Sequence, residues 1–179
     1  GLFCIMGKRS DFERVPRDFY PTPLSAVAPL QLFLPDQFTY TEPCAGDGRL
    51  IDHLSEFGGI CLQACDIEPR KEGVVEKDFS EVTPTGDYVI TNPPWDRKIL
   101  HPMIEHFVIK YHTPTWLLFD ADWVHTKQSA QYIPYLRKIV SIGRVKWIEG
   151  SKSVGKDNCC WYLFDGILEF ETKFYGRIF

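Results

Sequence analysis

Short apolar runs alternate along this chain with amphipathic segments, and most of the apolar runs end at a polar residue. Strands that alternate with helices indicate a mostly parallel α/β sheet. We predict strands, in chain order, over 38–43, 60–65, 73–77, 88–91, 115–119, 140–148 and 160–164. We predict helices over 24–34, 49–57, 99–111 and 129–138, the last of them broken or kinked at Pro134.

The last two predicted strands are joined by a loop too short for a helix, which favours an antiparallel hairpin at one edge of the sheet. We therefore expect a Rossmann-like, mostly parallel seven-stranded sheet with an antiparallel edge hairpin and helices on both faces. A chain of 179 residues fits one domain, which we expect over 24–179 after an extended N-terminal arm, 1–23. Ligands of such sheets bind at the carboxyl ends of the strands, where the polar motifs fall.

The first polar motif is Glu-Pro-Cys-Ala-Gly-Asp-Gly, residues 42–48, at a predicted strand-to-helix turn. Gly46 and Gly48 let a ligand approach the backbone, and Asp66, at the next strand end, is placed to accept hydrogen bonds from two ribose hydroxyls. Ile51 occupies the third glycine position of a dinucleotide fingerprint, and the acids of the turn would repel a pyrophosphate. Acids suit a ligand that brings an amine and a sulfonium, which is S-adenosylmethionine, although two glycines at a turn can also be purely structural.

The second polar motif is Asn92-Pro93-Pro94-Trp95, which follows a predicted strand. Two consecutive prolines have no backbone donors and leave their carbonyls free. The Asn92 side-chain oxygen and the Pro93 carbonyl can accept the two hydrogens of an exocyclic amine and stabilise the positive charge that grows on its nitrogen during methylation. Trp95 can stack on the base. The alternative interpretation is a Pro-Pro turn that ends a strand.

Together, these motifs resemble those of the amino-directed, S-adenosylmethionine-dependent DNA methyltransferases, and most closely the small adenine-N6 enzymes of bacteriophages and prophages. The resemblance covers roughly residues 10–165 and rests on an N-terminal cofactor motif at 18–23, the glycine motif at 42–48, the catalytic tetrapeptide at 92–95 and, more loosely, ribose and adenine motifs at 66–67 and 77–79. It implies a class I methyltransferase fold, S-adenosylmethionine as cofactor, and direct in-line transfer of a methyl group to adenine N6 in DNA.

The resemblance also implies roles for individual residues. Glu42 would bind the methionine amine of the cofactor, and Asp66 would hold its ribose. The full set of implied cofactor-binding residues is Phe19, Thr22, Glu42, Gly46, Gly48, Asp66, Ile67, Asp78 and Phe79. The implied catalytic residues are Asn92, Pro93, Pro94 and Trp95.

The chain departs from the family in its recognition of DNA. Such enzymes usually carry a target-recognition domain, which in this motif order would follow the last strand, and we expect no separate one here. A net charge of −4 is unusual for a tight nucleic-acid binder, so we expect transient DNA contact through local basic loops, although the same charges could simply be solvated. The candidates are Trp95, Arg97, Lys98, Lys152 and Lys156, with a basic arm of Lys8, Arg9, Arg14 and Arg17.

The six cysteines form no CxxC pair and fit neither a disulfide framework nor a zinc site. We therefore expect reduced thiols in a cytoplasmic protein, without a bound metal and without a membrane span. Three sets of residues are expected to be structural rather than functional. The histidines at 101, 106 and 112 are interpreted as packing or surface residues, and Phe107, Trp116, Trp147 and Trp161 as core. Asp120 and Asp122 end a predicted strand and are interpreted as helix caps, although they could also contact substrate.

Two alternatives to adenine methylation in DNA remain at this point. The same chemistry could act on cytosine N4, an RNA adenine or a protein glutamine. The chain could instead be a non-catalytic S-adenosylmethionine-binding subunit, against which the intact tetrapeptide argues. The sequence leaves open whether the protein is a monomer or a homodimer.

Overall fold

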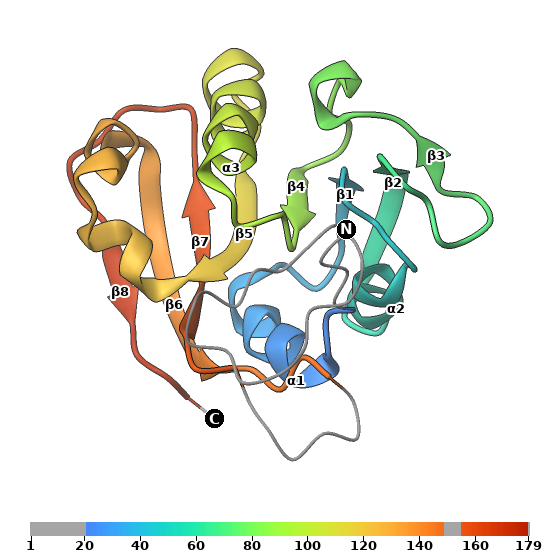
Figure 1. Cartoon of the computed structure of the whole chain (residues 1–179), viewed down its shortest axis with the longest axis horizontal. Helices are drawn as coiled ribbons and strands as arrows, with labels where there is room; N and C mark the ends of the chain where they lie inside the picture. The colour runs from blue at the N-terminus through green and yellow to red at the C-terminus, as the bar shows by residue number, and fades with distance from the viewer. Residues whose placement is uncertain (1–20, 149–154, 179) are drawn as a thin grey trace.

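The computed structural model describes residues 21–148 and 155–178 of the chain. These residues form one eight-stranded sheet with the strand order β3-β2-β1-β4-β5-β7-β6-β8 (Figure 1). Strands β1 to β5 run parallel, β7 runs antiparallel to both β5 and β6, and β8 runs parallel to β6. The strands are β1 (Phe38–Glu42), β2 (Gly59–Asp66), β3 (Val75–Glu76), β4 (Tyr88–Thr91), β5 (Thr115–Asp120), β6 (Leu136–Arg144), β7 (Asn158–Phe164) and β8 (Lys173–Tyr175).

The predicted α/β architecture is confirmed, with two corrections to the sheet. The number of strands is eight rather than seven, because β8 pairs with the outer side of β6. The hairpin of β6 and β7 is antiparallel as predicted, but β8 rather than the hairpin forms the edge. The sequence gives little sign of β8, because it is three residues long and its Phe174 side chain is 67% exposed.

The helical segments are shorter than predicted. The predicted helix 24–34 is a single turn followed by a 3-10 helix, and the predicted helix 99–111 becomes π-helical from Glu105 onward. The α-helices are α1 (Leu24–Val27), α2 (Arg49–Ser55) and α3 (Arg97–Ile104). The remaining helical segments are η2 (Ala28–Phe33), η3 (Phe79–Glu81), η4 (Glu105–Lys110), η5 (Ala121–His125), η6 (Lys127–Gln131) and η7 (Ile133–Tyr135). No helix in the described residues is long and apolar enough to span a membrane.

The predicted helix over 129–138 is wrong. These residues form the end of η6, the short η7 and the first part of β6. Pro134 lies inside η7 and has no amide hydrogen for an α-helical bond. From Leu136 onward the backbone pairs with β7, and further along also with β8, so sheet pairing replaces helical hydrogen bonds.

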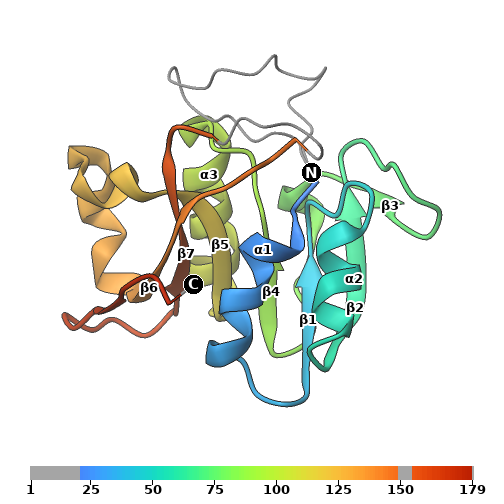
Figure 2. The same cartoon turned by 90° about the horizontal axis from the view of Figure 1, so that it is seen from below.

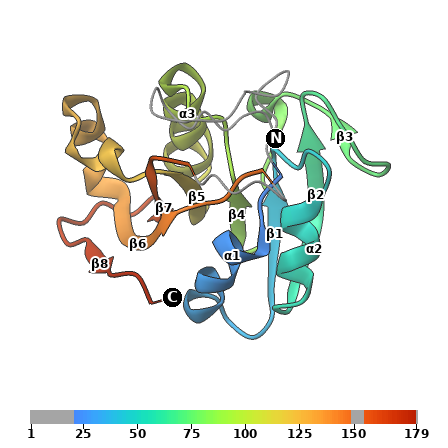
Figure 3. The same cartoon turned by 60° about the horizontal axis from the view of Figure 1, so that its bottom comes forward.

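Helical segments cover both faces of the sheet, as predicted. Trp161 and Tyr162 are neighbours on β7 and therefore point to opposite faces. The Trp161 indole donates to the Ala26 carbonyl of α1 at 2.8 Å, and α2 packs beside α1 (Figures 2 and 3). The Tyr162 ring packs against Trp123 of η5, whose indole in turn donates to His101 of α3 at 3.0 Å. Strand β5 lies between these two layers, and five of its six residues are buried.

Candidate active site

The turn after β1 is built around a buried acid. Glu42 is 1% exposed, and its Oε1 accepts a hydrogen bond from the Cys44 amide at 2.8 Å. Burial raises the pKa of Glu42 to about 7, although the bond from Cys44 favours the ionised form. Gly46 and Gly48 have φ values of 55° and 80°, a conformation that residues with a side chain rarely adopt. The turn therefore needs both glycines and holds a carboxyl group poised between its two protonation states.

Asp66 ties the end of β2 to this glycine turn. Its side chain is 2% exposed, its Oδ2 accepts from the Gly46 amide at 2.8 Å, and its Oδ1 accepts from the Glu68 amide at 2.7 Å. A carboxylate has about four lone-pair sites and can therefore accept more than two hydrogen bonds. Asp66 is thus a structural brace of the turn as well as a candidate ligand-binding residue.

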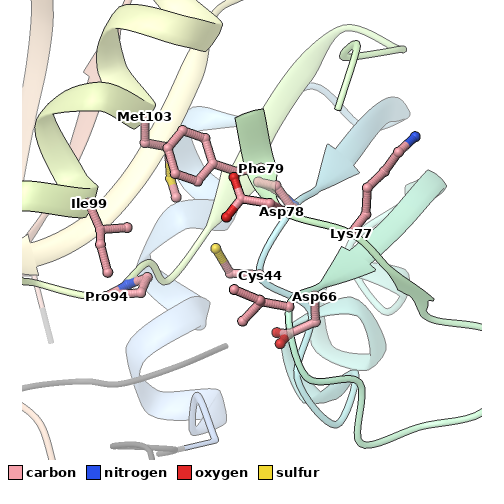
Figure 4. Close-up of a pocket in the computed structure, with 10 residues that line it drawn as sticks. Cys44, Asp66, Lys77, Asp78, Phe79, Pro94, Ile99 and Met103 are labelled. Atoms are coloured by element: carbon pink, nitrogen blue, oxygen red, sulfur yellow. The ribbon is translucent and has the colours of Figure 1, made fainter. Parts of the chain in front are cut away.

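A cavity of about 430 Å³ opens beside Asp66, at the carboxyl ends of β1, β2 and β4 (Figure 4). Its walls bring together four predicted cofactor residues and one residue of the tetrapeptide, although they lie far apart in sequence. The lining residues are Pro43, Cys44, Asp66, Ile67, Lys77, Asp78, Phe79, Pro94, Ile99 and Met103.

The apolar part of the cavity includes two residues that were not predicted from the sequence to bind the cofactor. Ile99 and Met103 are four residues apart on α3 and so lie on the same face of that helix. Asp78 occupies the polar rim, where its Oδ1 accepts from the amide and the hydroxyl of Ser80 at 2.9 and 2.6 Å. These bonds cap η3 and fix the position of Phe79, so this segment presents an apolar ring beside a carboxylate.

Asn92, at the start of the tetrapeptide, carries an unpaired acceptor. The side chain is 7% exposed, and its Nδ2 donates to the Thr22 hydroxyl at 3.1 Å. Its Oδ1 is buried and has no hydrogen-bond partner among the described residues. Leaving a buried acceptor unpaired costs about 1–3 kcal/mol, so such an atom calls for a functional explanation. Thr22 therefore orients an amide whose oxygen has no hydrogen-bond partner among the described residues.

Trp95 lies in the core, which corrects its interpretation as an open stacking surface. Its side chain is 5% exposed, and its indole donates to the Leu118 carbonyl of β5 at 3.1 Å. Its ring meets the Trp147 ring edge-on, with the centroids 6.1 Å apart. The physical reason is that a buried indole needs both an acceptor and packing partners, and β5 supplies the acceptor. In this structure Trp95 anchors the tetrapeptide to the sheet.

The residues predicted to contact DNA differ in their exposure and in their partners. Arg97 donates to the Trp95 carbonyl at 2.9 Å and forms an ion pair with Asp120, also at 2.9 Å. Its guanidinium is thus engaged within the protein, and we correct its assignment to a positioning role. Lys98 and Lys156 are exposed, whereas Lys152 lies outside the described residues.

The helix-cap interpretation of Asp120 is also wrong. Asp120 precedes η5, but its side chain makes no capping hydrogen bond and pairs with Arg97 instead. Asp122 lies in the first turn of η5. Phe19 and the basic arm of Lys8, Arg9, Arg14 and Arg17 fall outside the described residues.

His101, His106 and the four aromatic residues expected to be structural take part in packing in the structure. His101 accepts from Trp123, and burial lowers its pKa, while His106 Nε2 lies 2.7 Å from the Val82 carbonyl. The four predicted core aromatics, Phe107, Trp116, Trp147 and Trp161, are all at most 3% exposed. The cysteines of the described ranges are free thiols, and burial raises the pKa of Cys160 to about 12.

No protein-family model matches the chain, and no curated protein matches it. Solved structures do match. A candidate RNA methyltransferase of Pyrococcus horikoshii superposes with a TM-score of 0.58 at 15% identity, over 91% of this chain and 96% of that one. The modification subunit of a candidate type I restriction enzyme of Vibrio vulnificus gives 0.58 at 9% identity, over 88% of this chain and 47% of that one.

A third solved structure is that of a candidate methyltransferase of class I. A candidate class I S-adenosylmethionine-dependent methyltransferase of Listeria monocytogenes gives a TM-score of 0.57 at 9% identity, over 93% of this chain and 68% of that one. At such identities the likeness establishes the fold alone. The fold of this chain is therefore the Rossmann-like class I methyltransferase fold, as predicted from the motifs.

Proposed function

We propose that the protein transfers a methyl group from S-adenosylmethionine to the N6 amino group of adenine in DNA. The observation that carries this proposal is the buried, unpaired Oδ1 of Asn92, held by Thr22 at the end of β4. Pro94, two residues further on, lines the cavity at the ends of β1 and β2. We infer that this acceptor would face the amine while the cavity beside Pro94 would hold the cofactor.

The residues around the cavity fit S-adenosylmethionine in chemical type. Ile67, Phe79 and Met103 provide apolar walls for a purine ring, and the Asp66 carboxylate is a group that can accept hydrogen bonds from ribose hydroxyls. Glu42, on the neighbouring turn, supplies a carboxylate for the methionine amine. When bound, the cofactor would supply an electrophilic methyl group and the sulfur that leaves.

Asn92 and Pro93 would act on the acceptor. An exocyclic amine is a poor nucleophile because its lone pair is delocalised into the ring. The Asn92 Oδ1 and the Pro93 carbonyl would accept its two hydrogens and favour a pyramidal nitrogen. That nitrogen would form its bond to the methyl carbon as the carbon–sulfur bond breaks, and the two oxygens would stabilise the positive charge until the nitrogen passes one proton to water. No covalent intermediate with the protein is required.

The choice of adenine in DNA rests on the resemblance of the tetrapeptide to the adenine-N6 enzymes. The alternatives are cytosine N4, an RNA adenine and a glutamine amide, which present the same pair of amine hydrogens. Incubation with methyl-labelled S-adenosylmethionine and separate DNA, RNA and protein acceptors would test the choice. We expect label in DNA that contains adenine. Label in RNA or protein alone would show that the acceptor is not DNA. Cofactor binding without labelling of any acceptor would favour the non-catalytic subunit.

The raised pKa of Glu42 predicts a pH-dependent affinity for the cofactor. With a pKa of about 7 in the free protein, Glu42 is mostly neutral at pH 5.5 and mostly ionised at pH 7.5. The cofactor amine keeps its proton over most of this range, since free α-amino groups titrate near pH 8. Only the ionised carboxylate attracts that amine. Binding should therefore be roughly tenfold weaker at pH 5.5 than at pH 7.5 when measured by calorimetry.

The matched control is Glu42→Gln, which keeps the shape of the side chain but removes its titration. We expect this variant to bind weakly and nearly equally at both pH values. A wild-type affinity that is flat, or that falls as the pH rises from 5.5 to 7.5, would contradict the role of Glu42.

A further inference from the structure

A basic groove lies on the face of the sheet that carries α1. It is formed by two hollows of about 590 and 810 Å³, which share Ser25 and Lys146. Figure 3 shows the last described residues of the chain near α1 and the helical segment that follows it, and Arg177 and Ile178 line one of the two hollows. The lining residues are Pro23, Leu24, Ser25, Pro29, Arg49, His53, Ser141, Ile142, Arg144, Val145, Lys146, Trp147, Arg177 and Ile178. None of them is acidic, although the chain as a whole carries a net charge of −4.

The arginines of the groove are brought together by an irregularity in β6. The pairing of β6 with β7 shifts between Ser141 and Gly143, and Gly143 has a φ of 76°. A side-chain carbon at Gly143 would lie 2.8 Å from a terminal nitrogen of Arg177 and 3.0 Å from its Cζ. The guanidinium of Arg177 thus packs against bare backbone, in the same hollow as Arg144, the residue that follows the glycine.

The positive charges in this hollow are not neutralised by any acid that the structure describes. Arg144, Lys146 and Arg177 are exposed, and none of them forms an ion pair with an acid of the described ranges. Like charges held in one hollow repel one another unless an anion lies between them. Arginine is well suited to such an anion when it is a phosphate, because its planar fork donates two parallel hydrogen bonds.

The groove leads to the tetrapeptide from two sides. On one side, Pro23 lines the groove and directly follows Thr22, whose hydroxyl holds the Asn92 amide at 3.1 Å. On the other, Trp147 lines the groove and its ring packs on Trp95. A chain of phosphates lying in the groove would therefore pass close to the acceptor site.

We propose that the basic groove binds the phosphodiester backbone of the DNA that carries the acceptor base, with Arg144, Lys146 and Arg177 each contacting a phosphate. The identity of the partner rests on the proposed function, whereas the demand for a polyanion rests on the groove itself. The groove lies outside the loop residues expected from the sequence to contact DNA.

The test is a triple substitution, Arg144→Gln, Lys146→Gln and Arg177→Gln, in the full chain. Binding to a fluorescent duplex of about 20 base pairs would be followed by anisotropy over a range of salt concentrations. Each phosphate contact contributes about −0.9 to the slope of log affinity against log salt, so the slope should become shallower by roughly 2–3. Affinity at low salt should fall at least tenfold.

The matched control replaces three exposed lysines outside the groove, Lys110→Gln, Lys127→Gln and Lys173→Gln. Both variants lose three positive charges, so a general charge effect would weaken binding equally in the two. Equal weakening would overturn the proposal, as would an unchanged slope in the groove variant. Loss of RNA binding with DNA binding intact would overturn the assignment to DNA.

Two further measurements separate this inference from the proposed function. Calorimetry with S-adenosylmethionine should give the same affinity for the groove variant and the wild type, and their melting temperatures should agree, because the three side chains are exposed. In methyl transfer, the groove variant should show a raised KM for DNA with a nearly unchanged kcat. If no acceptor is methylated but the groove variant still loses duplex binding, the proposed function fails and the groove assignment holds.

Discussion

Replacing Asn92 with alanine should lower the rate of methyl transfer by roughly 10²–10³, the size of the effect of deleting one preorganised group that stabilises transition-state charge. The affinity for S-adenosylmethionine should stay within a few-fold, because Asn92 Oδ1 is proposed to contact the acceptor amine and not the cofactor. The measurement is a single-turnover rate at saturating cofactor, paired with calorimetry.

The structure adds a second readout for this variant. The Asn92 Oδ1 is buried without a partner among the described residues, so its removal relieves a desolvation cost instead of creating one. We therefore expect a melting temperature that is unchanged or higher despite the loss of activity. Thr22→Ser keeps the hydroxyl that holds the Asn92 amide and serves as the matched control, with near wild-type rates. Near-full turnover by Asn92→Ala would mean that the tetrapeptide has been assigned wrongly.

Asp66→Ala should weaken S-adenosylmethionine binding by roughly 2–4 kcal/mol, as expected for the loss of charge-assisted hydrogen bonds to two hydroxyls. The same substitution also strips the Gly46 and Glu68 amides of their acceptor, so it loosens the glycine turn. Affinity for the cofactor alone therefore does not separate a ligand contact from a brace.

A double-mutant cycle makes the separation. The wild type should bind S-adenosylmethionine much more tightly than an analogue that lacks both ribose hydroxyls, whereas Asp66→Ala should bind the two ligands almost equally. If the substitution weakens both ligands by the same factor, Asp66 only braces the turn and the ribose is held elsewhere. Circular dichroism and thermal unfolding would establish that the variant is folded.

The sheet and the glycine turn could be predicted because the sequence patterns that indicate them are local. The run at 88–91 is apolar and followed by a polar residue, and it forms β4 with the predicted bounds. Asp66 follows a buried residue of the strand and is the last residue of β2, as expected. The prediction of a helix over 129–138 was wrong. The spacing of apolar residues there is compatible with a helix, but the pairing of β6 with its neighbouring strands decides the structure.

The missed features depend on residues that are distant in sequence. Trp95 is apolar and follows two prolines, but its burial is set by Leu118, 23 positions later, and by Trp147. The bond from Asn92 to Thr22 spans 70 positions. The groove likewise requires Arg177 to reach back to Gly143, and no local pattern predicts that contact. Pairwise placement of this kind follows from the sheet order rather than from any motif.

The most direct test of the account is to incubate the protein with adenine-containing DNA and S-adenosylmethionine that carries a deuterated methyl group. The DNA would then be digested to nucleosides for mass spectrometry, with Asn92→Ala run in parallel. We expect the wild type to form deoxyadenosine with a deuterated methyl group on N6, and the variant to form it about 10²–10³ times more slowly. Label on a carbon atom of a base would contradict methylation of an amino group. Equal labelling by the wild type and the variant would contradict the role of Asn92.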